Sequence, residues 1–203
     1  MTAAAREVGT AAVPSEMIWH GRSVRLHHVA QGDCVFGFRP DDLLATLLGS
    51  CISVCVRDPS SGHGGMNHFL IPRSSAPLSD LKGVAMRFGS YAIERLVNRL
   101  IARGASRDTL EFKLFGGANM HHQSLAIGAQ NADFVEQFMA EEGFRVTASD
   151  LRGTQARKIR FLPSTGQVWL KRIGQPDRDL LRQEMAMGGL QMLDRMKGDV
   201  TVF

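Results

Sequence analysis

The chain holds 203 residues, of which 44% are hydrophobic and 22% are charged, with a net charge of +4. This length suits one domain with extensions, and this composition supports a hydrophobic core. Lys and Arg residues are scattered rather than gathered into a basic run with interleaved aromatic residues, which argues against nucleic-acid binding. No apolar run reaches the ~18–20 residues of a membrane-spanning helix, so we expect no membrane insertion.

Residues 1–16 do not show the basic start and apolar block of a secretory signal peptide. Their Ala, Thr and Gly content predicts a flexible lead, and we expect a cytoplasmic protein. The 3 cysteines, Cys34, Cys51 and Cys55, form no disulfide framework. In a reducing compartment each is either a small buried hydrophobic residue or a reactive thiol.

The first half of the chain predicts short strands. β-branched and apolar residues bounded by turn sequences favour strands over residues 23–29, 33–38, 51–57 and 66–71. Pro40, Asp41 and Asp42 are typical of the start of a helical turn. The apolar run that follows, residues 43–48, is too uniform to assign from its period.

The second half predicts two helices between further strands. Apolar residues at helical spacing indicate one helix over residues 88–101 and another around 134–139. Strands are expected over residues 110–115, 144–148, 158–162 and 167–173. Adjacent strand pairs with few helices predict an α+β fold of layered sheets with helices packed outside. This domain spans residues 17–173, and residues 174–203 form a C-terminal extension, helical or partly disordered.

The segment from Thr46 to Pro72 carries the most informative pattern. Cys51 follows a Gly49-Ser50 turn, and His68 lies seventeen residues further on, after a glycine-rich loop. A nucleophilic cysteine needs an open turn, a nearby base and amide donors for the oxyanion. Cys51 and His68 are therefore candidate catalytic residues, and the backbone of Gly49 and Ser50 is a candidate oxyanion site. A thiol activated in this way should alkylate faster than a free thiol at neutral pH.

Structural alternatives account for the other candidates. Cys34 and Cys55 sit within expected strands, where cysteine most often fills core. Cys51, Cys55, His63 and His68 superficially resemble a zinc finger, but their spacing is too short between the Cys and His pairs. We therefore expect neither a metal nor a cofactor.

Several blocks of the sequence strongly resemble the CheD family of chemoreceptor glutamine deamidases. The resemblance covers roughly Arg25 to Ile173. Its blocks are Leu47-Leu48-Gly49-Ser50-Cys51, Arg57-Asp58-Pro59, Gly64 to Pro72, Phe115 to Met120, Ile127 to Asn131, and Thr165-Gly166-Gln167-Val168.

This resemblance implies a cysteine-dependent protein-glutamine glutaminase that converts receptor glutamines to glutamates with release of ammonia. It implies a fold like the catalytic domain of cytotoxic necrotizing factor toxins, with Cys51 as nucleophile and His68 as its partner. The family's third catalytic residue, a Thr, falls on Ala45 in this chain, and Thr46 follows one position later. Either Thr46 takes that role or another group orients His68.

The implied partners are methyl-accepting chemotaxis receptors and a CheC-type phosphatase, with a location at receptor arrays. Two other hypotheses remain open. One is a different cysteine hydrolase or acyltransferase that uses the same pair. The other is a non-catalytic adaptation protein that binds receptors or the phosphatase.

Overall fold

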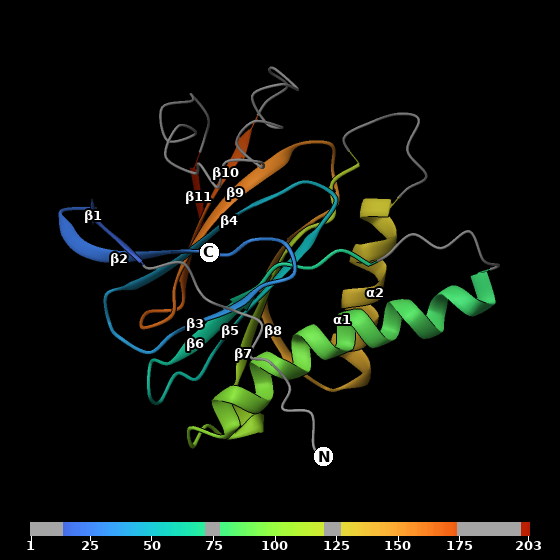
Figure 1. Ribbon diagram of the computed structural model, residues 1–203, viewed down its shortest axis with the longest axis horizontal. Coiled ribbons are helices and arrows are strands. Elements are labelled where there is room, and N and C mark those ends of the chain that lie inside the picture. The colour runs from blue at the N-terminus through green and yellow to red at the C-terminus, as the bar shows by residue number, and fades with distance from the viewer. Residues whose placement is uncertain (1–13, 72–77, 120–126, 174–199) are drawn as a thin grey trace, which may run out of the picture.

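A computed structural model of the chain describes residues 14–71, 78–119, 127–173 and 200–203. In these residues two β-sheets are stacked face to face, and two helices cover the outer face of one sheet (Figure 1). The predicted α+β class of layered sheets with outer helices is confirmed. The likeness to the toxin domain stays a prediction.

The first sheet has six strands in the order β1-β2-β4-β9-β10-β11. They are β1 (Ser15–Trp19), β2 (Arg22–His28), β4 (Asp42–Leu48), β9 (Ala156–Leu162), β10 (Gln167–Ile173) and β11 (Val200–Val202). β4 lies inside the sheet, parallel to β2 and antiparallel to β9. Leu44 of β4 packs between the sheets, whereas Leu43 and Ala45 pack in a separate cluster on the other face. Burial on both faces explains why this strand lacks an alternating pattern.

The second sheet has five strands in the order β3-β6-β5-β7-β8. They are β3 (Cys34–Gly37), β6 (Gly64–Asn67), β5 (Ile52–Arg57), β7 (Glu111–Gly116) and β8 (Arg145–Leu151). Helices α1 (Leu78–Ile101) and α2 (Ile127–Glu141) pack on this sheet, and a short 3-10 helix, η1 (Arg107–Thr109), precedes β7. The helices thus leave the inter-sheet layer to residues of the two sheets.

Three local predictions differ from the structure. The turn expected at Pro40–Asp42 is present, with Asp42 N donating to Arg39 O at 3.2 Å, but it starts no helix: β4 begins at Asp42, whose carboxylate accepts the N–H groups of Phe38 and Arg39 at 3.0 Å each. β6 ends at Asn67, earlier than expected, because the Asn67 side chain replaces the next ladder bond. α1 begins at Leu78, earlier than the predicted start at residue 88, and Leu81 and Val84 continue the apolar spacing of the predicted helix toward that end.

A strand lies across or beyond each predicted bound of the domain, residues 17 and 173. Ser15, assigned to the flexible lead, pairs with Leu26 as the first residue of β1. At the other end, Val200–Val202 forms β11 on β10 rather than a helix, and Phe203 packs against the inter-sheet core. Residues 174–199, where a C-terminal helix is predicted, lie outside the described residues. Neither described helix combines the length and apolar character needed to cross a membrane.

Candidate active site

Cys51 lies in the turn that carries the chain from β4 in one sheet to β5 in the other. All three carbonyl oxygens of this turn are held by hydrogen bonds. Ala118 N donates to Gly49 O at 2.9 Å, Asn131 Nδ2 to Ser50 O at 2.8 Å, and Gly117 N to Cys51 O at 2.8 Å. The carbonyls are therefore anchored on the protein side, and the turn is rigidly positioned.

The loop after β7 supports this turn through close backbone packing. Gly116 has φ of 117°, and a Cβ added there would lie 2.0 Å from Cys51 O. Only glycine allows this approach. The next residues tie the loop to α2, since Asn119 Oδ1 accepts the N–H of Gly128 at 3.1 Å near the helix start. The blocks Phe115 to Met120 and Ile127 to Asn131 thus support the Cys51 turn as far as the structure describes them.

His68 is brought to the same face as Cys51 by pairing across the sheet. Ile52 and Phe69 exchange two backbone hydrogen bonds of 2.9 Å each, which makes Cys51 and His68 diagonal neighbours. Such neighbours have Cα atoms ~7–8 Å apart, within reach of long side chains. Asn67 fixes the approach, because its Oδ1 accepts Val54 N at 2.8 Å and its Nδ2 donates to Ala92 O at 3.1 Å.

Thr46 of β4 contacts His68 from the opposite sheet. Thr46 Oγ1 lies 2.7 Å from Val29 O, to which it donates, and 2.9 Å from His68 Nδ1. Since the hydroxyl proton is used on Val29, the Thr46 oxygen accepts from Nδ1–H of His68. The network thereby assigns the neutral Nδ1–H tautomer. His68 Nε2 then carries a free lone pair, and it is buried without a hydrogen-bond partner.

Burial sets the protonation of both groups. Desolvation raises the pKa of the Cys51 thiol to about 11, although its own backbone N–H acts in the opposite direction. Desolvation lowers the pKa of His68 to about 4, opposed by the Val29 carbonyl. The resting pair is therefore a neutral thiol and a neutral imidazole. Cys51 is only 5% exposed, which accounts for this desolvation, and the faster alkylation expected of an activated thiol stays a prediction.

The connection from β2 to β3 is a part of the site that the sequence patterns did not reveal. Val29 supplies the carbonyl between Thr46 and His68. Two residues later, Gln31 Oε1 lies 3.7 Å from Cys51 Sγ. The Gly32-Asp33 turn signal marks this connection, but nothing in its composition indicates that it crosses the candidate site.

The remaining sequence candidates lie apart from this arrangement. Ala45 packs in the cluster on the far face of β4, away from the Thr46 side. Cys34 and Cys55 pack in the core, and burial raises the pKa of both thiols, that of Cys34 to about 12. His63 packs edge-on against Phe38. Among the described residues, no group of three or more His, Cys, Asp or Glu side chains could hold a metal ion.

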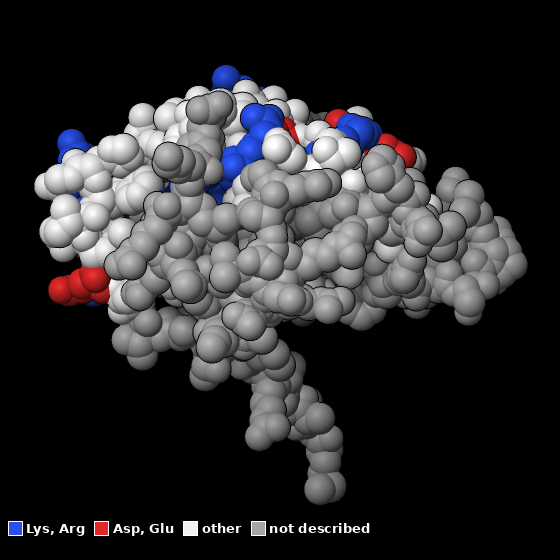
Figure 2. Space-filling view, turned by 90° about the horizontal axis from the view of Figure 1, so that it is seen from above, with Lys and Arg blue, Asp and Glu red and all other residues white. Residues whose placement is uncertain are grey.

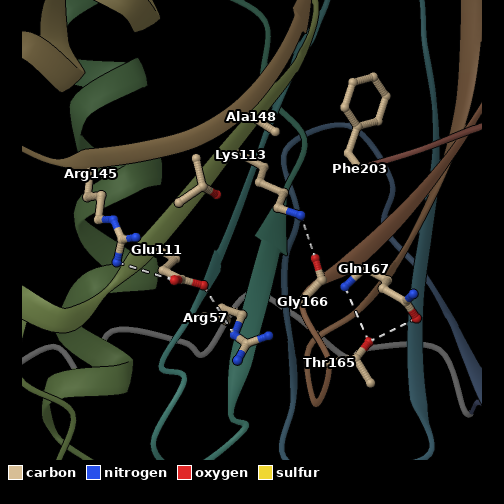
Figure 3. Close-up of a pocket in the computed structure, with 10 residues that line it drawn as sticks. Arg57, Glu111, Lys113, Arg145, Ala148, Thr165, Gly166, Gln167 and Phe203 are labelled. Atoms are coloured by element: carbon tan, nitrogen blue, oxygen red, sulfur yellow. Dashed lines mark hydrogen bonds and ion pairs between the residues drawn. The ribbon is translucent and has the colours of Figure 1, made fainter.

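An open cleft of about 540 Å³ lies at the other end of β5 (Figure 3). Arg57, which ends β5, is separated from Cys51 by roughly 20 Å of extended chain. In this cleft Glu111 lies between Arg57 and Arg145, at 3.6 and 3.4 Å. A Cβ at Gly166 would lie 2.3 Å from Arg57 Nη1, so the Arg57 and Gly166 blocks meet in a structural junction. Figure 2 shows that basic side chains on the face it displays also stand in separate groups, some beside acidic ones.

Comparison with known proteins identifies relatives along most of the chain. The family model described as "CheD chemotactic sensory transduction" matches residues 70–172, beginning just after His68. A Cereibacter sphaeroides protein named "Probable chemoreceptor glutamine deamidase CheD" is 44% identical over 180 residues, 89% of this chain and 86% of that protein. Proteins of the same name from Caulobacter vibrioides and Hahella chejuensis are 46% and 40% identical over 147 and 165 residues. These cover 72% and 80% of this chain, and 77% and 78% of the respective relatives. A match of this extent and identity means that the chain belongs to the CheD family.

Proposed function

We propose that this protein deamidates glutamine side chains of chemoreceptors, with Cys51 as nucleophile and His68 as its base. One observation carries the catalytic assignment: Thr46 hydrogen-bonds Nδ1 of His68 and leaves Nε2 buried without a partner, and strand pairing makes His68 a diagonal neighbour of Cys51. The names of the relatives support the substrate class.

The reaction needs one proton carrier. As the Cys51 sulfur attacks the glutamine Cδ, His68 Nε2 takes the thiol proton, and the carbonyl oxygen becomes an oxyanion. His68 then returns this proton to the amide nitrogen, and ammonia leaves a thioester on Cys51. Water attacks the thioester with His68 again as base, which releases glutamate and restores the thiol. The net change is glutamine plus water to glutamate plus ammonia.

The oxyanion would be held by N–H groups of the Gly49–Cys51 turn. The carbonyl oxygens of this turn accept hydrogen bonds from Ala118, Asn131 and Gly117. The backbone N–H groups of the turn are therefore the polar groups that remain for a substrate beside the Cys51 sulfur. The effect of the Cys51 N–H on its own sulfur supports this direction. Preorganised amides of this kind stabilise negative charge that develops in the transition state.

The proposed function is tested by incubating the protein with a receptor cytoplasmic fragment, followed by peptide mass mapping and an ammonia assay. Conversion of particular glutamines to glutamate is expected. Binding without conversion would contradict the proposal and favour the non-catalytic adaptation protein. Cleavage or cross-linking of the receptor would point instead to another cysteine hydrolase or acyltransferase.

Activity should be nearly independent of pH across the neutral range. His68 must be neutral to accept the proton, and with a pKa of about 4 it stays neutral until strongly acidic pH. Below that value imidazolium forms and kcat/KM should fall. Above about pH 11 Cys51 would ionise without its base. A pH profile measured on the receptor fragment checks this, and an acid limb near the ordinary histidine pKa would contradict it.

Thr46→Val should lower kcat about tenfold with little change in KM, since a net hydrogen bond that orients the base is lost. Thr46 is 1% exposed and makes its contacts inside the site, so the variant should leave receptor binding unchanged. Thr46→Ser keeps the hydroxyl and should retain most activity. Steady-state kinetics of both variants check the role, and equal losses in the two would argue for packing alone.

The family resemblance extends the proposal to a second partner and to a location. We propose that the protein acts in the cytoplasm beside receptor arrays and that it binds a CheC-type phosphatase. Co-purification with such a phosphatase, with and without receptor fragment, tests this binding separately from deamidation.

A further inference from the structure

The chain places a carboxamide of its own beside the candidate nucleophile. Gln31 Oε1 lies 3.7 Å from Cys51 Sγ, within reach of a weak hydrogen bond from the thiol. We propose that Gln31 occupies the carboxamide subsite in the free protein and that the glutamine of the substrate displaces it. This inference rests on the proposed function, because it identifies the subsite through a group that matches the proposed substrate.

The backbone around Gln31 is fixed to the site. Gln31 is the second residue of a turn in which Asp33 N donates to Ala30 O at 3.0 Å. The same turn grips His68 at both of its backbone groups, through Gly32 N to His68 O at 2.7 Å and His68 N to Asp33 O at 3.1 Å. The position of Gln31 over Cys51 is therefore tied to the position of the candidate base.

The exposure of the two side chains indicates which one lies on the solvent side. Cys51 is 5% exposed and packs in the inter-sheet core, whereas Gln31 is exposed. A substrate that reaches the sulfur from solvent meets the Gln31 carboxamide at that point. Within the described part of the chain this weak contact is the one hydrogen bond of the Gln31 side chain, so the side chain can swing into water at small cost while its backbone stays in place.

The contact resembles a resting state rather than an attack geometry. Its hydrogen-bond direction runs from the thiol to the carbonyl oxygen of Gln31. Attack requires the sulfur to approach the carbonyl carbon with the oxygen directed to the oxyanion donors. Gln31 thus covers the thiol, and a glutamine free of the turn can take the orientation that the reaction needs.

Displacement of a resident group reduces the apparent affinity for substrate by the fraction of molecules in which the subsite is open. Gln31→Ala should therefore lower KM for the receptor fragment about threefold and leave kcat unchanged, as expected for loss of one weak hydrogen bond. The same variant should alkylate at Cys51 about threefold faster with iodoacetamide, itself a carboxamide, by the same reasoning.

The experiment compares wild type, Gln31→Ala, Gln31→Glu and Gln167→Ala in both assays, with alkylation assigned to Cys51 by mass mapping. Gln31→Glu should alkylate more slowly than wild type, because a carboxylate beside the sulfur disfavours the thiolate. If Gln31 had only a structural role, Gln31→Ala and Gln31→Glu would not change the alkylation rate of Cys51 in opposite directions. Gln167, an exposed glutamine of the β9–β10 hairpin, is the matched control and should behave as wild type.

Unchanged alkylation and KM in Gln31→Ala would overturn the inference, as would a raised KM. Conversion of Gln31 itself to glutamate in wild type, absent from Cys51→Ala, would also overturn it, since Gln31 would then be a substrate. Alkylation needs no receptor. If wild type failed to deamidate receptors, the proposed function would fail, and the alkylation rates would still decide whether Gln31 covers the thiol.

Discussion

Cys51→Ala should abolish the conversion of receptor glutamine to glutamate, with a loss of about 10⁴-fold or more, because no other group can form the thioester. The neighbouring thiols offer no substitute. Cys55 is 1% exposed in the core, and Cys34 lies in β3, where burial raises its pKa to about 12. The measurement is peptide mass mapping of the receptor fragment after incubation with equal amounts of each protein.

Cys55→Ala is the matched control for this loss. Cys55 shares a face of β5 with the Cys51 turn and packs in the same cluster, so its removal costs packing without touching the proposed chemistry. Activity per folded molecule should stay near wild type. Equal activity of Cys51→Ala and wild type would refute the nucleophile assignment, and equal losses in both cysteine variants would attribute the effect to packing.

The sequence patterns predict those helices and strands that are buried on one face only. β7 alternates between core and partly exposed residues, so its pattern predicts a strand close to the observed bounds. α1 has a regular apolar stripe, and its pattern predicts the C-terminal end of the helix. β4 was not assignable, because both of its faces are covered. β11 could not be foreseen either, since its three residues have meaning only through pairing with β10.

The candidate site likewise has features that local sequence reveals and features that depend on contacts between distant residues. Local chemistry in the sequence identifies Cys51, which follows a turn before a strand, and His68, which follows a glycine-rich loop before the next apolar run. The contacts that position them are long-range: Val29 and Thr46 are hydrogen-bonded across seventeen positions, and Asn131 reaches Ser50 across 81. Thr46 was named through the family resemblance, whereas Gln31 and Asn131 were missed. Only the stacking of the two sheets brings such groups together.

Strand alternation explains why Thr46, rather than the residue at position 45, contacts His68. Successive residues of β4 point to opposite faces, so Ala45 and Thr46 cannot serve the same side. Ala45 lies on the outer face and Thr46 on the face toward His68. Thr46 therefore presents a hydroxyl to His68 one position after the residue onto which the family's Thr falls.

His68→Asn should lower kcat by about 10²–10⁴-fold, the range for loss of a general base. Asparagine can place an amide N–H near the position of Nδ1 and keep a donor toward Thr46 and Val29, but it has no group at Nε2. The variant thus removes the proposed base while it retains much of the local hydrogen bonding. Turnover of the receptor fragment at neutral pH is the measurement, with His63→Asn as a matched control outside the site.

Alkylation of Cys51 as a function of pH separates the base from a packing role. At neutral pH the thiol of His68→Asn has no proton acceptor and should alkylate more slowly than in wild type. As the pH approaches the thiol pKa of about 11, the sulfur ionises unaided and the two rates should converge. A deficit that persists unchanged at high pH would mean that His68 shapes access to Cys51 rather than taking its proton.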